Sequence, residues 1–126
     1  MPKSFIYMAS PYSINAPTST EEGRALREFR YAEALRYLSD WTKMGEVVFS
    51  PIVHSHPMSW THDMPGTWDF WSKIDYCFID NCEKLRVLKM PDWDKSVGIT
   101  AELAYAAKVG KEIEYVDYRE DRPTKS

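Results

Sequence analysis

The chain has 126 residues, of which 44% are hydrophobic and 28% are charged, and its formal net charge is −3. This length and composition are typical of a single globular domain, here residues 1–126, that is large enough to bury a core. The negative charge argues against a surface that coats a nucleic acid, and no apolar run is long enough to span a membrane. We therefore expect neither a nucleic-acid polymer nor a membrane as a partner.

In chain order, the first strand pattern covers Ser4–Met8 and is ended by the turn formers Ser10–Ser13. A long helix is then predicted from Thr20, which can cap its first turn, to Gly45. Apolar residues recur within it near helical spacing, which predicts one face packed on a sheet: Leu26, Phe29, Ala32, Leu35, Leu38 and Trp41.

The middle of the chain contains two further strand patterns and one helix pattern. Val47–Ser50 predicts a short second strand, and Leu85–Met90 predicts a third. Between them, Ile52–Thr67 shows no convincing period and is rich in proline, so a long loop is expected there. Trp68–Asn81 predicts a second helix. A loop of that length in so small a domain is often functional.

The last part of the chain predicts a helix over Ser96–Gly110, a fourth strand over Ile113–Val116 and a loose polar tail over 119–126. Alternating strands and helices imply right-handed crossovers, and hence a mainly parallel sheet with helices on both faces. The simplest strand order is 2-1-3-4, which describes a small flavodoxin-like or Rossmann-like α/β fold.

In that order the chain reverses direction between the first and third strands, and such a switch point forms a ligand crevice. The loop after the first strand contains Ser10 and Tyr12, and the segment after the third contains Ser96 and Gly98. A hydroxyl and a glycine at the start of a helix let the backbone approach a ligand closely. The residues with the most ligand-like chemistry thus fall at the predicted crevice.

Glu102 is expected about one turn inside the last helix, facing the crevice. A carboxylate there can act as a nucleophile, as a general base, or only as a favourable charge near the helix start. Tyr7, at the end of the first strand, either donates a hydrogen bond to that carboxylate or packs beneath a loop.

A second carboxylate is expected from the helix that precedes the third strand. Asp75 lies there, with Asp69, Asp80 and Glu83 nearby, and spacing alone does not choose between them. Two carboxylates in different surroundings are a usual arrangement for an acid and a nucleophile.

The predicted loop also contains a His-x-His pair, His54 and His56, without the Cys or carboxylate partner of a standard zinc pattern. We expect no metal and no other cofactor. Instead, His54 is expected to line the crevice together with neighbouring indole rings, which would either stack on a flat ligand or pack in the core: Trp60, Trp68 and Trp71.

Four arginines on the first helix could reach a phosphate, although pairing with neighbouring glutamates on a solvated face is favoured: Arg24, Arg27, Arg30 and Arg36. The two cysteines, Cys77 and Cys82, match no metal or redox motif. We expect both to be reduced, buried thiols. The chain also opens without a secretion-signal pattern, and together these features favour a cytoplasmic protein.

Three pieces in this order resemble the nucleoside 2-deoxyribosyltransferase superfamily: Ile6–Tyr12, Asp75, and Ser96-x-Gly98-x-x-x-Glu102-Leu103. The Ser-Pro-Ile-x-His-Ser-His sequence of Ser50–His56 is similar to a segment of small members. The resemblance extends to about Tyr115. It implies a flavodoxin-like or Rossmann-like sheet, a small-molecule nucleoside or nucleotide and a nucleobase as ligands, and a homo-oligomer, dimeric or larger.

The resemblance also implies roles for individual residues. Glu102 matches the nucleophile that attacks the anomeric carbon, Tyr7 the tyrosine that hydrogen-bonds it, and Asp75 the aspartate that helps to protonate the leaving base. Residues expected to contact the substrate, from the resemblance or from their place at the crevice, are Ser10, Tyr12, Ser96, Gly98, His54, Trp60 and Trp71.

Ser96 falls where the transferases keep an aspartate on the sugar's 5′ hydroxyl, whereas related nucleotide hydrolases carry a serine on the 5′-phosphate. Tyr12 falls where those hydrolases have an arginine. Three hypotheses therefore remain: transfer of the sugar to another nucleobase, hydrolysis of a nucleoside 5′-monophosphate, and a non-catalytic nucleotide-binding module.

Overall fold

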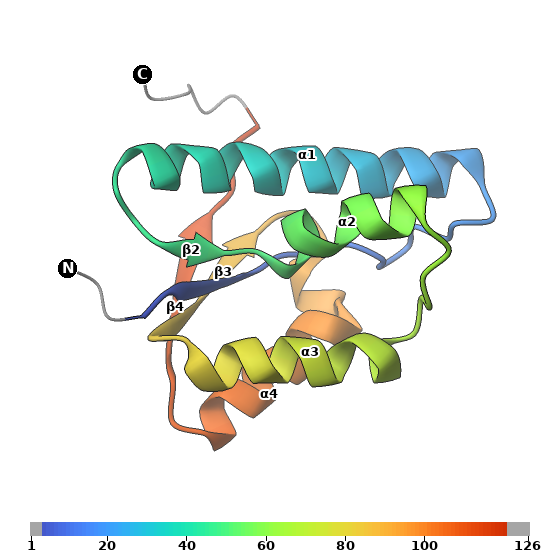
Figure 1. Cartoon of the computed structure of the whole chain (residues 1–126). Coiled ribbons are helices and arrows are strands. Elements are labelled where there is room, and N and C mark those ends of the chain that lie inside the picture. Colours follow the sequence, from blue (N-terminus) through green and yellow to red (C-terminus); the bar gives the residue numbers. More distant parts are fainter. Residues whose placement is uncertain (1–3, 121–126) are drawn as a thin grey trace.

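The computed structural model describes residues 4–120, which form a four-stranded sheet covered by helices (Figure 1). The strands are all parallel and follow the order β2-β1-β3-β4, so the predicted α/β topology is confirmed. The elements are β1 (Ile6–Ala9), α1 (Glu21–Lys43), β2 (Val48–Phe49), α2 (Pro51–Thr61), α3 (Trp68–Asn81), β3 (Lys84–Lys89), the short 3₁₀ helix η1 (Trp93–Lys95), α4 (Val97–Lys108) and β4 (Glu112–Asp117).

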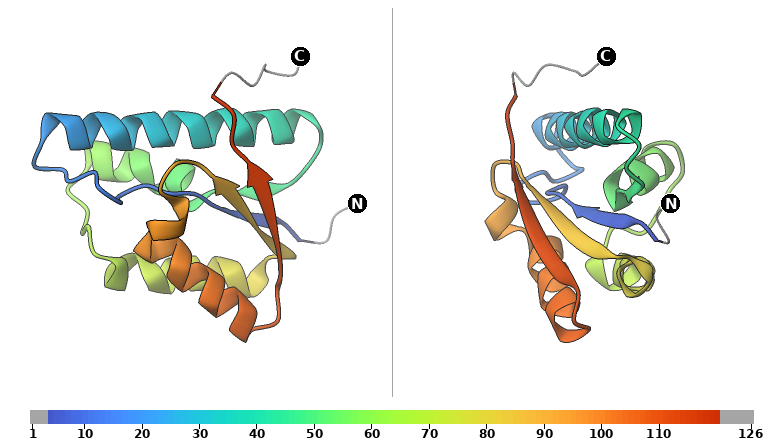
Figure 2. Two further views of the ribbon diagram at one scale, coloured as in Figure 1. Left: turned by 180° about the vertical axis from the view of Figure 1, so that it is seen from behind. Right: turned by 90° about the vertical axis from the view of Figure 1, so that its left-hand side faces the viewer.

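Helices cover both faces of the sheet, as Figure 2 shows from two further directions. Successive side chains of a strand point to opposite faces, so Tyr7 and Met8 of β1 belong to different cores. On one side α3 and α4 pack against Tyr7, Leu85 and Val87. On the other side α1 packs against Met8 and Leu88, with Val53 of α2 beside them.

The buried face of α1 differs from the predicted one. Phe29 and Leu35, which were expected to face the sheet, are 42% and 38% exposed. Trp41 is buried as predicted, but the other buried residues of α1 were not predicted: Gly23, Arg30, Ala34, Tyr37 and Asp40. The prediction was wrong in part because it counted only large apolar residues, whereas the buried face also includes a glycine, an arginine and an aspartate.

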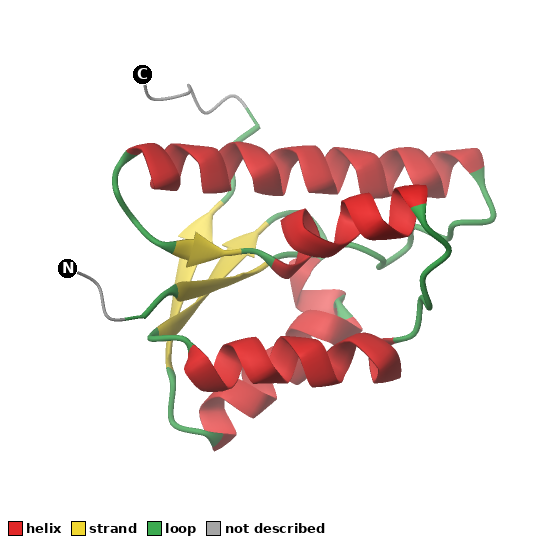
Figure 3. Ribbon diagram, in the orientation of Figure 1, coloured by secondary structure: helices red, strands yellow, loops and turns green. Residues whose placement is uncertain are grey.

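The expectation of a loop over Ile52–Thr67 was also wrong, because most of this segment belongs to α2 (Figure 3). Ser50 caps the helix by accepting a hydrogen bond from the Val53 backbone N–H at 3.1 Å. Pro51 occupies the first helical residue, where its missing N–H has no intrahelical partner to lose. Pro57 lies inside the helix and removes one backbone hydrogen bond, which weakens the helical pattern in the sequence.

The connection from β1 to α1 is fastened to the helix that follows it. The buried Arg30 side chain donates hydrogen bonds from Nη1 to the backbone oxygens of Tyr12 and Ile14, at 2.8 and 2.5 Å. Gly23 is needed where the loop crosses α1, because a Cβ there would lie 1.9 Å from the Pro17 carbonyl oxygen. The loop that carries Tyr12 is therefore held in one place.

The remaining predictions need smaller changes. The first strand begins at Ile6 and ends at Ala9, slightly later in the chain than the predicted Ser4–Met8. Cys82 is buried as expected, but Cys77 is exposed, and both are free thiols. Of the tail predicted over 119–126, residues 121–126 lie outside the described residues. Within residues 4–120, no helix is both long enough and apolar enough to cross a membrane.

Candidate active site

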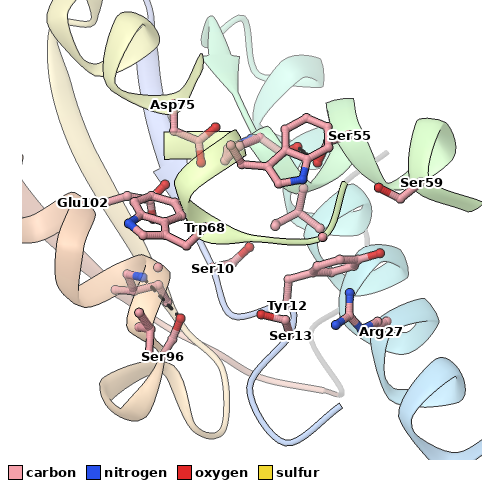
Figure 4. A pocket seen from close by; sticks show the side chains of 17 residues that line it. Ser10, Tyr12, Ser13, Arg27, Ser55, Ser59, Trp68, Asp75, Ser96 and Glu102 are labelled. Carbon is pink, nitrogen blue, oxygen red and sulfur yellow. Dashed lines mark hydrogen bonds between the residues drawn. The ribbon is translucent and has the colours of Figure 1, made fainter. Parts of the chain in front are cut away.

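A pocket opens beyond the carboxyl ends of β1 and β3, at the switch point of the sheet (Figure 4). Its walls come from the β1–α1 loop, α1, α2, α3 and the start of α4. Its lining residues are Ser10, Tyr12, Ser13, Arg27, Pro51, Ile52, Ser55, Ser59, Gly66, Trp68, Trp71, Asp75, Ser96, Val97, Gly98, Ile99 and Glu102.

Glu102 lies in the second turn of α4 and is only 4% exposed. The hydroxyl of Tyr7, a fully buried residue of β1, donates a short hydrogen bond to Glu102 Oε2. The hydrogen bond expected between these residues is thus confirmed. It fixes the direction of the carboxylate at the wall of the pocket.

Asp75 is the carboxylate of α3 that joins this pair. It is 8% exposed and lines the pocket, whereas Asp69, Asp80 and Glu83 are exposed. Asp80 instead accepts a hydrogen bond from the Tyr105 hydroxyl at 2.6 Å on the outer surface. The structure therefore selects Asp75, which residue spacing did not.

The three groups perturb one another electrostatically. Burial raises the pKa of Glu102, and the neighbouring Asp75 carboxylate raises it further. Burial also raises the pKa of Asp75, while hydrogen bonding to Tyr7 and Glu102 partly offsets the rise. The pKa of Tyr7 is raised well above its ordinary value by burial and by both carboxylates. Two carboxyl groups in one desolvated space favour a state in which a single proton remains on the pair.

The start of α4 brings polar groups to the same pocket. Ser96 caps the helix by accepting a hydrogen bond from the Ile99 backbone N–H at 3.2 Å, which leaves its own O–H free to donate to a ligand. Ser10 is 6% exposed, and its buried Oγ has no hydrogen-bond partner among the described residues. A Cβ on Gly98 would lie 3.7 Å from the Trp68 ring, so the glycine leaves space beside that ring.

Of the predicted aromatic group, Trp68 and Trp71 line the pocket, and Trp71 is fixed by a hydrogen bond from its Nε1 to the Pro65 carbonyl oxygen at 2.7 Å. Trp60 does not line the pocket. It is 45% exposed and its ring lies against that of His56, with 4.5 Å between the centroids.

His54 is likewise outside the pocket and lies near the Phe49 and Phe78 rings, with centroids 5.6 and 6.3 Å away. The prediction of Trp60 and His54 as substrate contacts was made for a loop. Because the segment is a helix, the residues that face the pocket are instead Pro51, Ile52, Ser55 and Ser59. A serine followed by a proline, as at Ser50–Pro51, is a common helix start. Recognising it would have predicted a helix in which Ser55 and Ser59, four residues apart, lie on the same face.

A second polar cluster stands at the side of the pocket away from the two carboxylates. Tyr12 Oη lies 2.6 Å from His56 Nδ1, and His56 Nε2 lies 2.8 Å from Glu28 Oε2. The Arg27 guanidinium lies over the Tyr12 ring, 5.0 Å from its centroid. Arg27 was expected on a solvated helix face, paired with a neighbouring glutamate, but it lines the pocket instead.

No group of three or more His, Cys, Asp or Glu side chains that could hold a metal ion occurs within residues 4–120. His56 is instead engaged by Tyr12 and Glu28, and its ring stacks on Tyr31 with 4.2 Å between centroids.

In comparisons with known proteins, no curated protein matches the chain. One family model matches residues 4–117, which include every strand and helix described above. The chain therefore belongs to the family described as a domain of unknown function (DUF1937).

Proposed function

We propose that this protein cleaves the N-glycosidic bond of a nucleoside or deoxynucleoside through a covalent glycosyl-Glu102 intermediate, and transfers the sugar to another nucleobase. The observation that carries the proposal is the buried cluster of Glu102, Asp75 and Tyr7 in the wall of an open pocket. The resemblance of the same three residues to the nucleoside 2-deoxyribosyltransferase superfamily supports it.

In the first step a Glu102 oxygen attacks C1′ of the sugar and the C–N bond breaks. The electron pair of that bond leaves with the base, and the proton held by the carboxyl pair passes through Asp75 to a base nitrogen. The raised pKa of Asp75 suits it to carry a proton near neutral pH. The Tyr7 hydrogen bond keeps the attacking carboxylate oriented.

In the second step a nitrogen of the incoming base attacks C1′, and the bond between the sugar and Glu102 breaks. Asp75 accepts the proton that the incoming base loses, so the enzyme returns to its starting state. Trp68 and Trp71 line the pocket and offer flat surfaces for a nucleobase. Water in place of the second base would give hydrolysis by the same steps.

Hydrolysis of a nucleoside 5′-monophosphate is the second candidate, and Ser96 favours it. An acidic side chain beside a phosphate would place like charges together in a partly desolvated site. Ser96 is neutral and buried at the start of α4, with a hydroxyl free to donate. A non-catalytic nucleotide-binding module is the third candidate, and would bind the ligand without releasing its base.

We further propose that the protein works in the cytoplasm as a homo-oligomer. Its two cysteines are unpaired although one of them is exposed, which suits a reducing compartment. The oligomer follows from the resemblance.

The test is an incubation with each common deoxynucleoside or its 5′-monophosphate, with and without a second free base, followed by chromatography of the products. Base exchange supports transfer, whereas base release that needs the phosphate and no acceptor supports hydrolysis. Glu102→Gln should abolish both reactions, while the matched variant Glu83→Gln changes an exposed glutamate and should retain them. An active Glu102→Gln protein would eliminate the proposed nucleophile.

A further inference from the structure

Arg27 is the one lysine or arginine side chain that lines the pocket within residues 4–120. We propose that Arg27, held against Tyr12, binds a phosphate monoester group of the substrate at the side of the pocket away from Asp75 and Glu102. The proposal rests on the proposed function for the rest of the substrate, a nucleoside. It adds the residue that recognises an anionic group of the substrate.

The contacts of Arg27 leave its charge available to a ligand. Its Nε donates a hydrogen bond to the Ala16 carbonyl oxygen at 2.5 Å, which anchors the side chain by one nitrogen. Glu28 is its neighbour in sequence, but the Glu28 carboxylate contacts His56. Among the described residues, no carboxylate forms an ion pair with Arg27.

The other arginines of α1 are engaged differently. Arg30 is buried, bonds two loop carbonyl oxygens and lies 3.7 Å from Asp92. Arg36 pairs with Glu33 at 2.7 Å. Arg24 is exposed and bonds the Thr18 carbonyl oxygen, but it does not line the pocket.

A chain of contacts holds Arg27 in place. His56 is hydrogen-bonded to Tyr12 Oη through Nδ1 and to Glu28 through Nε2, so the Tyr12 ring is fixed from its far end. The Arg27 guanidinium lies over this fixed ring. A side chain that is already fixed before binding, such as Arg27, loses less conformational freedom when a ligand binds.

The charge distribution of the pocket determines which way the substrate lies. Figure 4 shows Arg27 and Tyr12 across the pocket from Asp75 and Glu102, with Ser10 between them. An anionic group near the two carboxylates would be repelled, whereas near Arg27 it meets a cation. The glycosidic bond then lies toward Glu102 and the anion toward Arg27.

The hydroxyl groups of the pocket favour phosphate over a carboxylate. A phosphate monoester has three terminal acceptor oxygens, which need several donors. Besides Arg27, the lining offers serine hydroxyls, of which the buried Ser10 Oγ has no hydrogen-bond partner within residues 4–120. Ser55 is already committed, because its hydroxyl donates to the Pro51 carbonyl oxygen at 2.7 Å.

The experiment measures binding by calorimetry in the Glu102→Gln protein, which removes the nucleophile and so prevents turnover. Each of the four common deoxynucleosides is compared with its own 5′-monophosphate. The monophosphate of at least one pair should bind more tightly than the nucleoside. Arg27→Gln should weaken monophosphate binding by about 10- to 100-fold, the range for a lost charged hydrogen bond, and leave nucleoside binding unchanged.

Arg24→Gln is the matched control, because Arg24 also fastens the β1–α1 loop but does not line the pocket. It should leave the preference for the monophosphate intact. Tyr12→Phe keeps the ring beneath Arg27 and removes the bond to His56, so it should weaken monophosphate binding by less than Arg27→Gln does.

Equal affinities for nucleoside and monophosphate in the Glu102→Gln protein, or no binding of either, would overturn the proposal. So would an equal loss for both ligands in Arg27→Gln. If the variant with both substitutions does not fold, a salt titration of the Glu102→Gln protein decides instead. Added salt should weaken monophosphate binding and spare nucleoside binding, and an equal response of the two affinities contradicts the proposal. Arginine-dependent binding without base release would count against the proposed function alone, and base exchange without a phosphate preference against this inference alone.

Discussion

Replacing Glu102 with glutamine keeps the shape of a buried side chain and removes its ionisable proton. Glu102 is 4% exposed, and burial and Asp75 both raise its pKa above the ordinary value. A raised pKa in the folded state means that the folded protein holds this proton more tightly than the unfolded chain does. The stability that the protonated Glu102 contributes is therefore fully present below the ordinary carboxyl pKa of about 4.3. It is lost as the pH rises through the raised pKa.

Glutamine cannot ionise, so the variant does not lose this stability at high pH. The pKa of Glu102 is raised to about 8, and each pKa unit corresponds to about 1.4 kcal/mol, so half of this rise already corresponds to about 2–3 kcal/mol. The glutamine amide oxygen still accepts the Tyr7 hydrogen bond. We therefore expect Glu102→Gln to be more stable than the parent by about 2–3 kcal/mol above pH 8, while the difference shrinks toward pH 5.

The assay is urea unfolding across this pH range, with the free energy of unfolding compared between the parent, Glu102→Gln and Glu83→Gln. The exposed glutamate at residue 83 should show no comparable pH-dependent gain. A Glu102→Gln protein that is less stable than the parent at high pH would refute the reasoning, because it would mean that the ionised carboxylate stabilises the fold.

Three further substitutions test the geometry of the pocket. Tyr7→Phe removes the hydroxyl that orients Glu102 and should lower kcat by about 10- to 100-fold, measured by base release; an unchanged kcat would deny Tyr7 its positioning role. Gly98→Ala should stabilise the protein by up to about 0.5 kcal/mol through helix propensity, seen as a slightly higher melting temperature. It should also raise KM, because its methyl group fits beside Trp68 only in the empty pocket; an unaltered KM would show that no ligand occupies this space. Gly23→Ala should destabilise the protein in thermal unfolding, since its Cβ would lie 1.9 Å from a loop carbonyl oxygen, and a wild-type melting temperature would contradict the close approach.

The parts of the fold that depend on topology could be predicted from the sequence. Strand and helix patterns alternate, and a parallel sheet of that order has its crevice at the ends of β1 and β3. Ser10 and Ser96 were therefore expected at the pocket, and both line it. Tyr7 and Glu102 were expected to meet, and they do.

The parts that depend on the direction of individual side chains could not be predicted. Periodicity places the helix that contains Asp75 but not its rotation about the axis, so nearby aspartates were equivalent until the helix was packed. Arg27 belongs to a helix whose charged residues suggested a solvated face, and only the tertiary contacts of Tyr12 and Ala16 bring it to the pocket.

The proline-rich segment shows a different limit of sequence patterns. Its helix is stabilised by a serine cap, by the proline at its start and by packing against α1. In the sequence, the serine and the proline are also typical of a turn. Treating it as a loop assigned His54 and Trp60 to the pocket, where the helix places Ser55 and Ser59. An error in one local element thus changed which side chains were expected to meet the ligand.

The most direct test of the central claim is mass spectrometry of the protein quenched during turnover of a deoxynucleoside. We predict a mass increase equal to one deoxyribosyl group, located by peptide mapping on Glu102 and absent from Glu102→Gln. Base release by the parent protein with no such adduct, together with an active Glu102→Gln variant, would contradict the account.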